Sequence, residues 1–158
     1  MCHTTATEME WLIMTDGSLR IFTDNNTFME MLHGDICSLI LKAFYSTYTV
    51  LPFGLDRLFY AKFLTIEMQS LGLKVEVNKK QHVSYRDNII GELTFDFVVN
   101  NAVIIQIENQ KSFLHPEQVE VCKNYLKLTD FEVLLLLNFS VELEHKRLLL
   151  TNDFKKKI

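Results

Sequence analysis

The feature that most constrains the fold is a pair of predicted strands on either side of Asn100-Asn101. Residues 92–99 alternate between apolar and other side chains, and residues 102–108 are rich in Val and Ile. One face of the first strand would carry Leu93, Phe95, Phe97 and Val99. A period of two indicates a strand with one face turned to a core, and asparagine favours a turn. The sequence therefore predicts two adjacent strands of one sheet.

Predicted helices surround these strands. Apolar residues recur every three or four positions over residues 28–45, and Asp24, Asn25 and Asn26 are candidate N-caps. A second helix is expected over residues 55–71, with Gly72 as its stop, and a third over residues 116–128, started by Pro116. The second helix would bury Leu55, Leu58, Phe59, Phe63, Ile66, Met68 and Leu71.

Further strands complete the pattern. Short strands are expected at residues 74–77 and 83–85 around a polar turn, and a final one at residues 147–151. Residues 132–138 contain four consecutive leucines, which predicts a strand covered on both faces. Asp16-Gly17 between two apolar runs predicts a hairpin over residues 11–22. This order indicates an α/β (α+β) sandwich built around one sheet.

A length of 158 residues fits a single domain. We expect residues 1–8 to form a loose start, 9–23 an added hairpin, 28–151 the core, and 152–158 a basic tail exposed to solvent. The longest apolar run, Val133 to Leu137, is far shorter than the roughly 20 residues of a membrane helix. No secretory leader is recognisable, so no membrane partner is expected.

Charge and cysteine content narrow the class of function. The net charge is −4, with 16 basic against 20 acidic residues. A nucleic-acid binder usually has a basic excess, so this balance favours a protein partner without excluding nucleic acid. Cys2, Cys37 and Cys122 are odd in number and widely spaced, which favours reduced thiols and a cytoplasmic, intracellular location.

Four short segments, taken in order, resemble one known family. Residues 54–60 (GLDRLFY) resemble its GxxExxY signature, 72–76 (GLKVE) its "RGLKVE" segment, and 91–96 (GELTFD) its "GEYRAD" segment. Residues 124–127 (NYLK) and 136–139 (LLNF) resemble "NYLK" and "LLNFG". The chain thus resembles the GxxExxY family, a branch of the PD-(D/E)XK nuclease-like superfamily. The resemblance implies a restriction-endonuclease-like fold, a central mixed sheet flanked by helices, to which the hairpin at residues 11–22 is an addition.

The resemblance also implies a catalytic site, and this sequence departs from it. In the superfamily a helix Glu, a strand Asp and a downstream Glu-x-Lys meet in a cleft, where carboxylates hold Mg²⁺ and the Lys acts on the attacking water. The corresponding positions are Arg57, Asp96, Gln106 and Glu108, and Val121 stands where the family's next helix carries Gln. Asp96 alone is kept among these five positions. We therefore interpret Arg57, Asp96, Gln106 and Glu108 as remnants of a degenerate catalytic site.

The spacing of Asp96 and Gln106 tests the register. Their separation is even, so they face each other only if the loop has an odd number of residues. A three-residue loop of Asn100, Asn101 and Ala102 achieves this and also pairs Phe97 with Ile105. A two-residue turn would set Asp96 opposite Ile105 instead. We expect the three-residue loop.

The exchanges at Arg57 and Glu108 resemble a charge swap. We hypothesise that Arg57 pairs with Glu108 or with Asp96 in a partly buried ion pair that fills the former metal site. The competing interpretation is that Arg57 points to solvent. A different alternative keeps a metal: Glu92, Asp96 and Glu108 would share a face and bind Mg²⁺ with the Ile107 carbonyl, and Lys111 would reach back as the cation.

Three functions follow from these observations. The first is a catalytically inactive nuclease-like protein that needs no cofactor and acts as a binding, adaptor or regulatory subunit, with a protein partner or a second copy of itself. The second is a Mg²⁺-dependent DNA or RNA nuclease with a rearranged site. The third is nucleic-acid binding without cleavage, for which Lys79, Lys80 and Arg86 with the Lys155 tail are candidate contacts.

Overall fold

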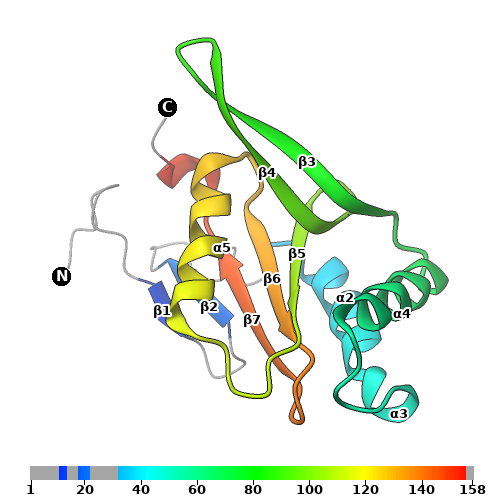
Figure 1. The fold of residues 1–158 in the computed structure, drawn as a ribbon. Coiled ribbons are helices and arrows are strands. Elements are labelled where there is room, and N and C mark those ends of the chain that lie inside the picture. Colours follow the sequence, from blue (N-terminus) through cyan, green and yellow to red (C-terminus); the bar gives the residue numbers. More distant parts are fainter. Residues whose placement is uncertain (1–10, 14–17, 22–31, 156–158) are drawn as a thin grey trace.

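The computed structural model describes residues 11–13, 18–21 and 32–155, and for residues 11–13 and 18–21 only the backbone. In this part of the chain seven strands form one mixed sheet in the order β1-β2-β7-β6-β5-β4-β3 (Figure 1). The strands are β1 (Trp11–Ile13), β2 (Ser18–Ile21), β3 (Val75–Tyr85), β4 (Asn88–Val99), β5 (Val103–Glu108), β6 (Val133–Asn138) and β7 (Glu144–Leu149). The helices are α2 (Gly34–Tyr45), α3 (Thr47–Val50), α4 (Arg57–Ser70) and α5 (Pro116–Leu128), with a 3₁₀ turn, η1, at Asn152–Phe154.

Helices cover both faces of the sheet, as the α/β sandwich prediction requires (Figure 1). One core lies between the sheet and α2 and α4 and contains Phe44, Leu64, Phe97 and Leu135. The other lies under α5 and contains Phe95, Ile104, Leu126 and Leu148. Strand β6 contributes to both cores, and all six of its residues are buried. The four leucines of β6 are therefore covered on both faces, as predicted.

The predicted hairpin at residues 11–22 is present: β1 pairs antiparallel with β2, and β2 extends the sheet by pairing in parallel with β7. Helix α5 begins at Pro116 as expected, and α4 ends before Gly72, whose φ of 83° suits a residue without a Cβ. The final strand, expected at residues 147–151, is instead Glu144–Leu149. The expected loose start, the N-cap candidates at 24–26 and the first residues of the 28–45 helix lie outside the described residues.

The region expected to contain two short strands is one long hairpin. Strand β3 runs without a break through the polar residues 78–82, and the turn lies at Arg86-Asp87, not near residue 80. Both turn residues have positive φ, 47° and 61°, as in the tight turns that suit a twisted hairpin. The polar residues misled the prediction because the outer end of this hairpin extends beyond the helices, where residues 84–92 are all exposed (Figure 1).

Two helix predictions need correction. His33, at a φ of 53°, precedes the start of α2 at Gly34, so the helix does not run continuously from residue 28. Helix α4 buries Tyr60, Leu64 and Met68, whereas three members of the predicted stripe, Leu58, Phe59 and Ile66, are exposed. Apolar residues surround more than one side of this helix, so the sequence is compatible with several rotations and packing selects one of them.

The chain end is not wholly a solvated tail. The Nζ atom of Lys155 donates to the carbonyl oxygens of Thr129, at 2.8 Å, and Phe131. Burial is the main reason that the pKa of Lys155 falls to about 8, although Glu132 and Asp130 oppose the shift. Lys156 and Lys157 lie outside the described residues.

Candidate functional site

The site is built where β4 and β5 separate. Their backbone pairing covers only Phe97–Ile105, Val98–Ile104 and Val99–Val103, which confirms the three-residue loop. Beyond these three pairs, side chains take the place of backbone groups as hydrogen-bond partners. The Asp96 amide donates to Oε1 of Gln106 at 2.7 Å, and the Ile107 amide donates to Oδ2 of Asp96 at 2.8 Å. Asp96 and Gln106 therefore face each other, and the two side chains span the gap between the strands.

The alternation of side chains between the two faces of strand β4 is also broken at this point. Phe97 and Val99 belong to the core under α4, but Phe95 belongs with Val98 to the core under α5. The predicted single apolar face containing both Phe95 and Phe97 is therefore wrong. Opposite Asp96, the neighbouring strand has Asn78 at a φ of 51°. This local irregularity accompanies the break in alternation and leaves the Asp96 carboxylate at the boundary between the two faces.

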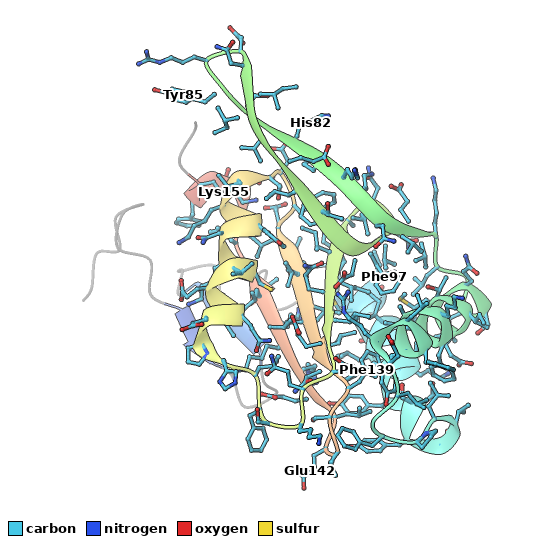
Figure 2. All side chains as sticks on the ribbon, in the orientation of Figure 1. His82, Tyr85, Phe97, Phe139, Glu142 and Lys155 are labelled. Atoms are coloured by element: carbon cyan, nitrogen blue, oxygen red, sulfur yellow. The ribbon has the colours of Figure 1, made fainter. Side chains whose placement is uncertain are left out.

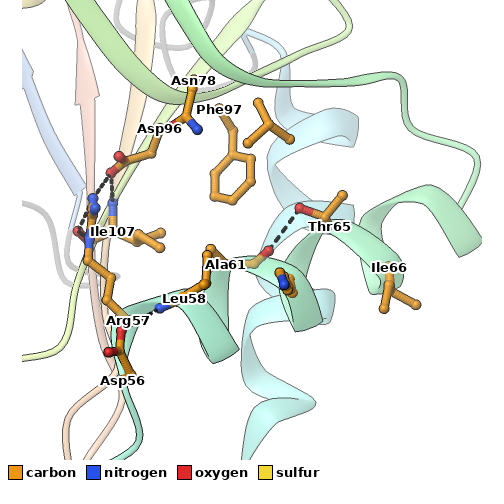
Figure 3. A pocket seen from close by; sticks show the side chains of 12 residues that line it. Asp56, Arg57, Leu58, Ala61, Thr65, Ile66, Asn78, Asp96, Phe97 and Ile107 are labelled. Carbon is orange, nitrogen blue, oxygen red and sulfur yellow. Dashed lines mark hydrogen bonds and ion pairs between the residues drawn. The ribbon is translucent and has the colours of Figure 1, made fainter.

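Arg57, the first residue of α4, reaches across this boundary (Figure 3). Its Nη2 atom lies 2.5 Å from Oδ2 of Asp96, and both Nε and Nη2 lie 3.2 Å from the carbonyl oxygen of Ile107. Asp56 caps the helix by accepting from the Leu58 amide at 3.0 Å, which fixes the position of Arg57. Of the two predicted ion pairs, the one with Asp96 forms; the Asp96 side chain is 16% exposed, whereas that of Arg57 remains 49% exposed to solvent.

A cleft of about 650 Å³ opens beside this ion pair, between α4 and strands β3 to β5 (Figure 3). Its apolar lining includes Leu58, Ala61, Ile66, Val77, Phe97 and Ile107, and its polar lining includes Asp56, Arg57, Lys62, Thr65, Asn78 and Asp96. The volume is in the range of ligand pockets. The sequence analysis missed Lys62 and Asn78 as site residues. The Asn-Lys-Lys run at 78–80 was a signal, but it was interpreted as a turn.

Glu108 belongs to the opposite side of the site. Ile104 lies four residues before Glu108 on β5, so the two side chains share a face of the strand. Ile104 faces the core under α5, while Ile105 and Ile107 face α4. Burial raises the pKa of Glu108. The charge of Arg57 opposes this shift, and the charge of Asp96 adds to it. Burial also raises the pKa of the Cys122 thiol on α5 to about 12, with contributions from Glu108 and Asp96. Glu108 therefore lies toward α5 and is not a partner of Arg57 in an ion pair.

The remaining predicted residues are not brought to this point. Glu92 lies out on the β3–β4 hairpin, where its carboxylate is 3.2 Å from Nζ of Lys80 and 3.6 Å from Nδ1 of His82. Lys111 is exposed and follows the end of β5, and Val121 is 48% exposed on α5. The proposed arrangement of Glu92, Asp96 and Glu108 on one face is therefore not found.

A divalent ion does not fit the site as it is arranged. Oδ2 of Asp96 already accepts from Arg57 and from the Ile107 amide, and the Ile107 carbonyl accepts from Arg57. Hard cations need several free oxygen ligands. Across residues 11–13, 18–21 and 32–155, no group of three or more His, Cys, Asp and Glu side chains is placed to hold a metal.

Comparison with known proteins identifies the superfamily. A family model described as the PD-(D/E)XK nuclease superfamily matches residues 34–148, well over half of the chain. The chain belongs to this superfamily, in agreement with its mixed sheet flanked by helices. Neither the search of curated proteins nor that of solved structures finds a match. In the part of the chain that the structure describes, no helix is both long and apolar enough to cross a membrane.

Proposed function

We propose that this chain is a non-catalytic member of the superfamily, from its GxxExxY branch, and that it acts as a binding, adaptor or regulatory subunit. One observation carries the proposal. The guanidinium of Arg57 contacts both the carboxylate of Asp96 and the carbonyl of Ile107. These are the oxygens that a catalytic metal in this cleft would use, so a fixed monovalent cation takes the place of a mobile divalent one.

Two further residues support the absence of catalysis. Gln106 is neutral, and its Oε1 is occupied by the Asp96 amide, so it adds no anionic ligand. Glu108 stands where the family's Lys would stabilise charge developing on the phosphate, and a carboxylate repels that charge instead. The cleft therefore lacks the groups that phosphodiester hydrolysis needs.

The charges of the β3–β4 hairpin favour a protein over a nucleic acid. Lys79 is paired with Glu76 at 2.7 Å and Lys80 with Glu92 at 3.2 Å. Arg86 lies over the ring of Tyr85, 5.2 Å from its centroid. Lys79 and Lys80 are thus each paired with an acid of the same hairpin. Within the described part of the chain, this leaves Arg86 as the one basic candidate there without an acidic partner and weakens the basic stripe that phosphate binding favours.

The direct test is a cleavage assay. Purified protein is incubated with supercoiled DNA, single-stranded DNA and RNA in millimolar Mg²⁺ or Mn²⁺, beside an Asp96→Ala variant. We expect the wild type and the variant to show the same background level of nucleic-acid cleavage. Cleavage by the wild type that disappears in Asp96→Ala would overturn the proposal and establish the rearranged nuclease.

A second test restores the missing acids. In the double variant Arg57→Glu/Gln106→Glu, carboxylates replace the guanidinium and the neutral amide beside Asp96. Mutual repulsion should lower its melting temperature, and Mn²⁺ should recover part of the loss by binding the native state. Adding Asp96→Ala should abolish the recovery. Comparable Mn²⁺ stabilisation of the wild type, lost in Asp96→Ala, would contradict our account of Arg57.

A further inference from the structure

The β3–β4 hairpin ends in an uncovered apolar tip. Residues 84–92, here called the arm tip, are all exposed, and they include Tyr85, Ile89 and Ile90 at 46%, 64% and 65% exposure. The tip stands clear of both helical layers, as the position of Tyr85 shows (Figure 2). Ile89 pairs with Ser84 and Gly91 with Val83, so Ile90 is the extra residue of a bulge, and the two successive isoleucines together present apolar surface at the tip.

The cleft at the base of the same hairpin is also apolar and uncovered. Leu58 and Ile66 on α4 are 59% and 64% exposed, and Val77 on β3 is 50% exposed. Lys62, one helical turn from each of these α4 residues, lies between them on the lining of the cleft. The cleft can therefore receive a large aliphatic side chain accompanied by a carboxylate.

The tip carries that combination of groups. Asp87, in the turn, is exposed and lies beside Ile89 and Ile90, whereas the cleft contributes the ammonium of Lys62. The cleft's own carboxylates are engaged: Asp96 by Arg57, and Asp56 by the Leu58 amide. The turn also carries the exposed cation Arg86, so the tip presents one charge of each sign. The cleft likewise presents both signs, because Asp56 keeps its negative charge beside Lys62, and Asp87 can face Lys62 while Arg86 faces Asp56.

The tip cannot enter the cleft of its own chain. Ile89 pairs with Ser84, which lies seven residues along β3 from Val77 at the cleft. At ~3.3 Å per residue the two are roughly 23 Å apart along the strand. The pairing of β3 with β4 continues on both sides of Asn78 and of the bulge at Val83–Ser84 and keeps the tip away from the base of the hairpin, so the partner of the tip has to be a different molecule.

We propose that this partner is a second copy of the chain, with each arm tip docked in the other copy's cleft. A hairpin that carries a receptor at its base and the matching ligand at its tip is self-complementary about a twofold axis across its middle. Two hairpins crossing in opposite directions place each tip at the other's base, and the contact closes as a dimer. The inference rests on the proposed function, in which the cleft is a binding surface.

Docking through side chains fits this hairpin better than pairing of two β3 edges. Strand β3 ends the described sheet, but Lys79 and Lys80 lie in its middle and Asn78 interrupts its regular conformation. Central lysines and local irregularities are features that discourage edge-to-edge pairing. The exposed isoleucines and the cleft remain as the apolar surfaces that a dimer would bury.

The first experiment measures self-association by sedimentation equilibrium over a series of concentrations. We expect a monomer–dimer equilibrium, weakened about tenfold or more in the dissociation constant by Ile90→Asp at the tip or by Ile66→Asp in the cleft. Val141→Asp is the matched control, because Val141 is 61% exposed but lies in the β6–β7 connection, away from both surfaces. A wild type that stays monomeric throughout would overturn the inference.

Mixing the two variants distinguishes this reciprocal docking of tips in clefts, here called arm exchange, from other kinds of dimer. An Ile90→Asp copy keeps its cleft and an Ile66→Asp copy keeps its tip, so a mixed dimer retains one intact contact and each variant alone retains none. We expect association to return only in the mixture. Equal weakness of the mixture and of its components would contradict arm exchange, as would failure of Ile90→Cys and Ile66→Cys copies to cross-link on oxidation when mixed.

These outcomes are independent of the cleavage assay. A strict monomer that cuts no nucleic acid would remove the second copy as partner but leave the proposed function standing. A dimer that cuts in an Asp96-dependent manner would remove the proposed function. Circular dichroism of each variant confirms that a loss of association does not come from unfolding.

Discussion

The two sides of strand β5 differ in how they hold their neighbours. On one side, β5 pairs with β6 at every residue from Val103 to Glu108. On the other, it pairs with β4 at three positions and then separates, with Asp96 and Gln106 supplying side-chain partners. The first side is an ordinary buried sheet whose stability comes from apolar packing. The second is a gap that side chains hold open, and the cleft lies at that gap.

The difference teaches that the strand separation at the site depends on side-chain hydrogen bonds and not on backbone pairing. The gap is maintained because Asp96 and Gln106 satisfy the backbone amides that the separation leaves without strand partners. Arg57 then closes the opening from the helix side.

The largest expected effect is on the β6 side. Leu135→Ala removes a side chain with no exposed surface from the core under α4, so we expect a loss of about 2–5 kcal/mol in the free energy of unfolding, measured in urea. Leu58→Ala, at a 59% exposed position of the cleft, is the control and should stay within about 0.5 kcal/mol of wild type. Similar losses in both would show that the cleft is as closely packed as the sheet.

A smaller effect is expected where side chains hold the gap. Asp96→Ala leaves the Ile107 amide and the Arg57 guanidinium without their shared acceptor, and we expect a loss of about 1–3 kcal/mol. Asp96→Asn keeps an acceptor oxygen but removes the charge, so its loss should be smaller. Asp153→Ala, at an exposed acid of η1, should be close to neutral. A neutral Asp96→Ala would mean that the ion pair does not hold α4 to the sheet.

Gln106 is expected to matter slightly less. Gln106→Leu removes the acceptor of the Asp96 amide, which we expect to cost about 1 kcal/mol and to speed hydrogen exchange of that amide relative to the Phe97 amide. Gln106→Glu keeps the acceptor oxygen and is the matched control for hydrogen exchange, which should stay slow at the Asp96 amide although the added charge repels the Asp96 carboxylate. Unchanged exchange at Asp96 in the Leu variant would show that Gln106 does not bridge the gap in solution.

The smallest effect concerns Glu108 and pH. Burial raises its pKa in the folded protein above the ordinary 4.5, so its contribution to stability is full below that value and is lost as pH rises through the native pKa. Glu108→Gln resembles the protonated form. It should therefore be more stable than wild type at pH 7, with the gain disappearing below about pH 4.5. Exposed Glu142→Gln should show no such difference, and a gain independent of pH would contradict the assignment to burial.

The sequence predicted the elements that depend on local pattern. Pro116 started α5, the leucines of β6 indicated a strand covered on both faces, and parity across Asn100-Asn101 set the β4–β5 register. Each of these follows from a property of one residue or of a short periodic run. From the sequence, the ion-pair partner of Arg57 could be limited to Asp96 or Glu108. The choice between them depends on strand twist, which decides which carboxylate α4 can reach.

Other features could not be obtained in this way. The buried side of α4 was misassigned, since its apolar residues permit several rotations and only contact with the sheet selects Tyr60, Leu64 and Met68. The switch of Phe95 to the core under α5 breaks the alternation that a local pattern assumes. The length of the β3–β4 hairpin was hidden because a hairpin outside the helical layers needs no apolar face.

By itself the sequence predicted that Asp96 and Gln106 face each other and that Arg57 pairs with a nearby carboxylate, and the structure shows both contacts. It also determined that the chain builds one mixed sheet between helical layers, since that follows from the order and period of its apolar residues. Tertiary structure alone decided that Arg57 hydrogen-bonds to Asp96 and to the Ile107 carbonyl. It also decided that Glu108 lies toward α5 and that apolar side chains of α4 line an open cleft. Those outcomes depend on the twist and separation of strands distant in sequence, which no local pattern encodes.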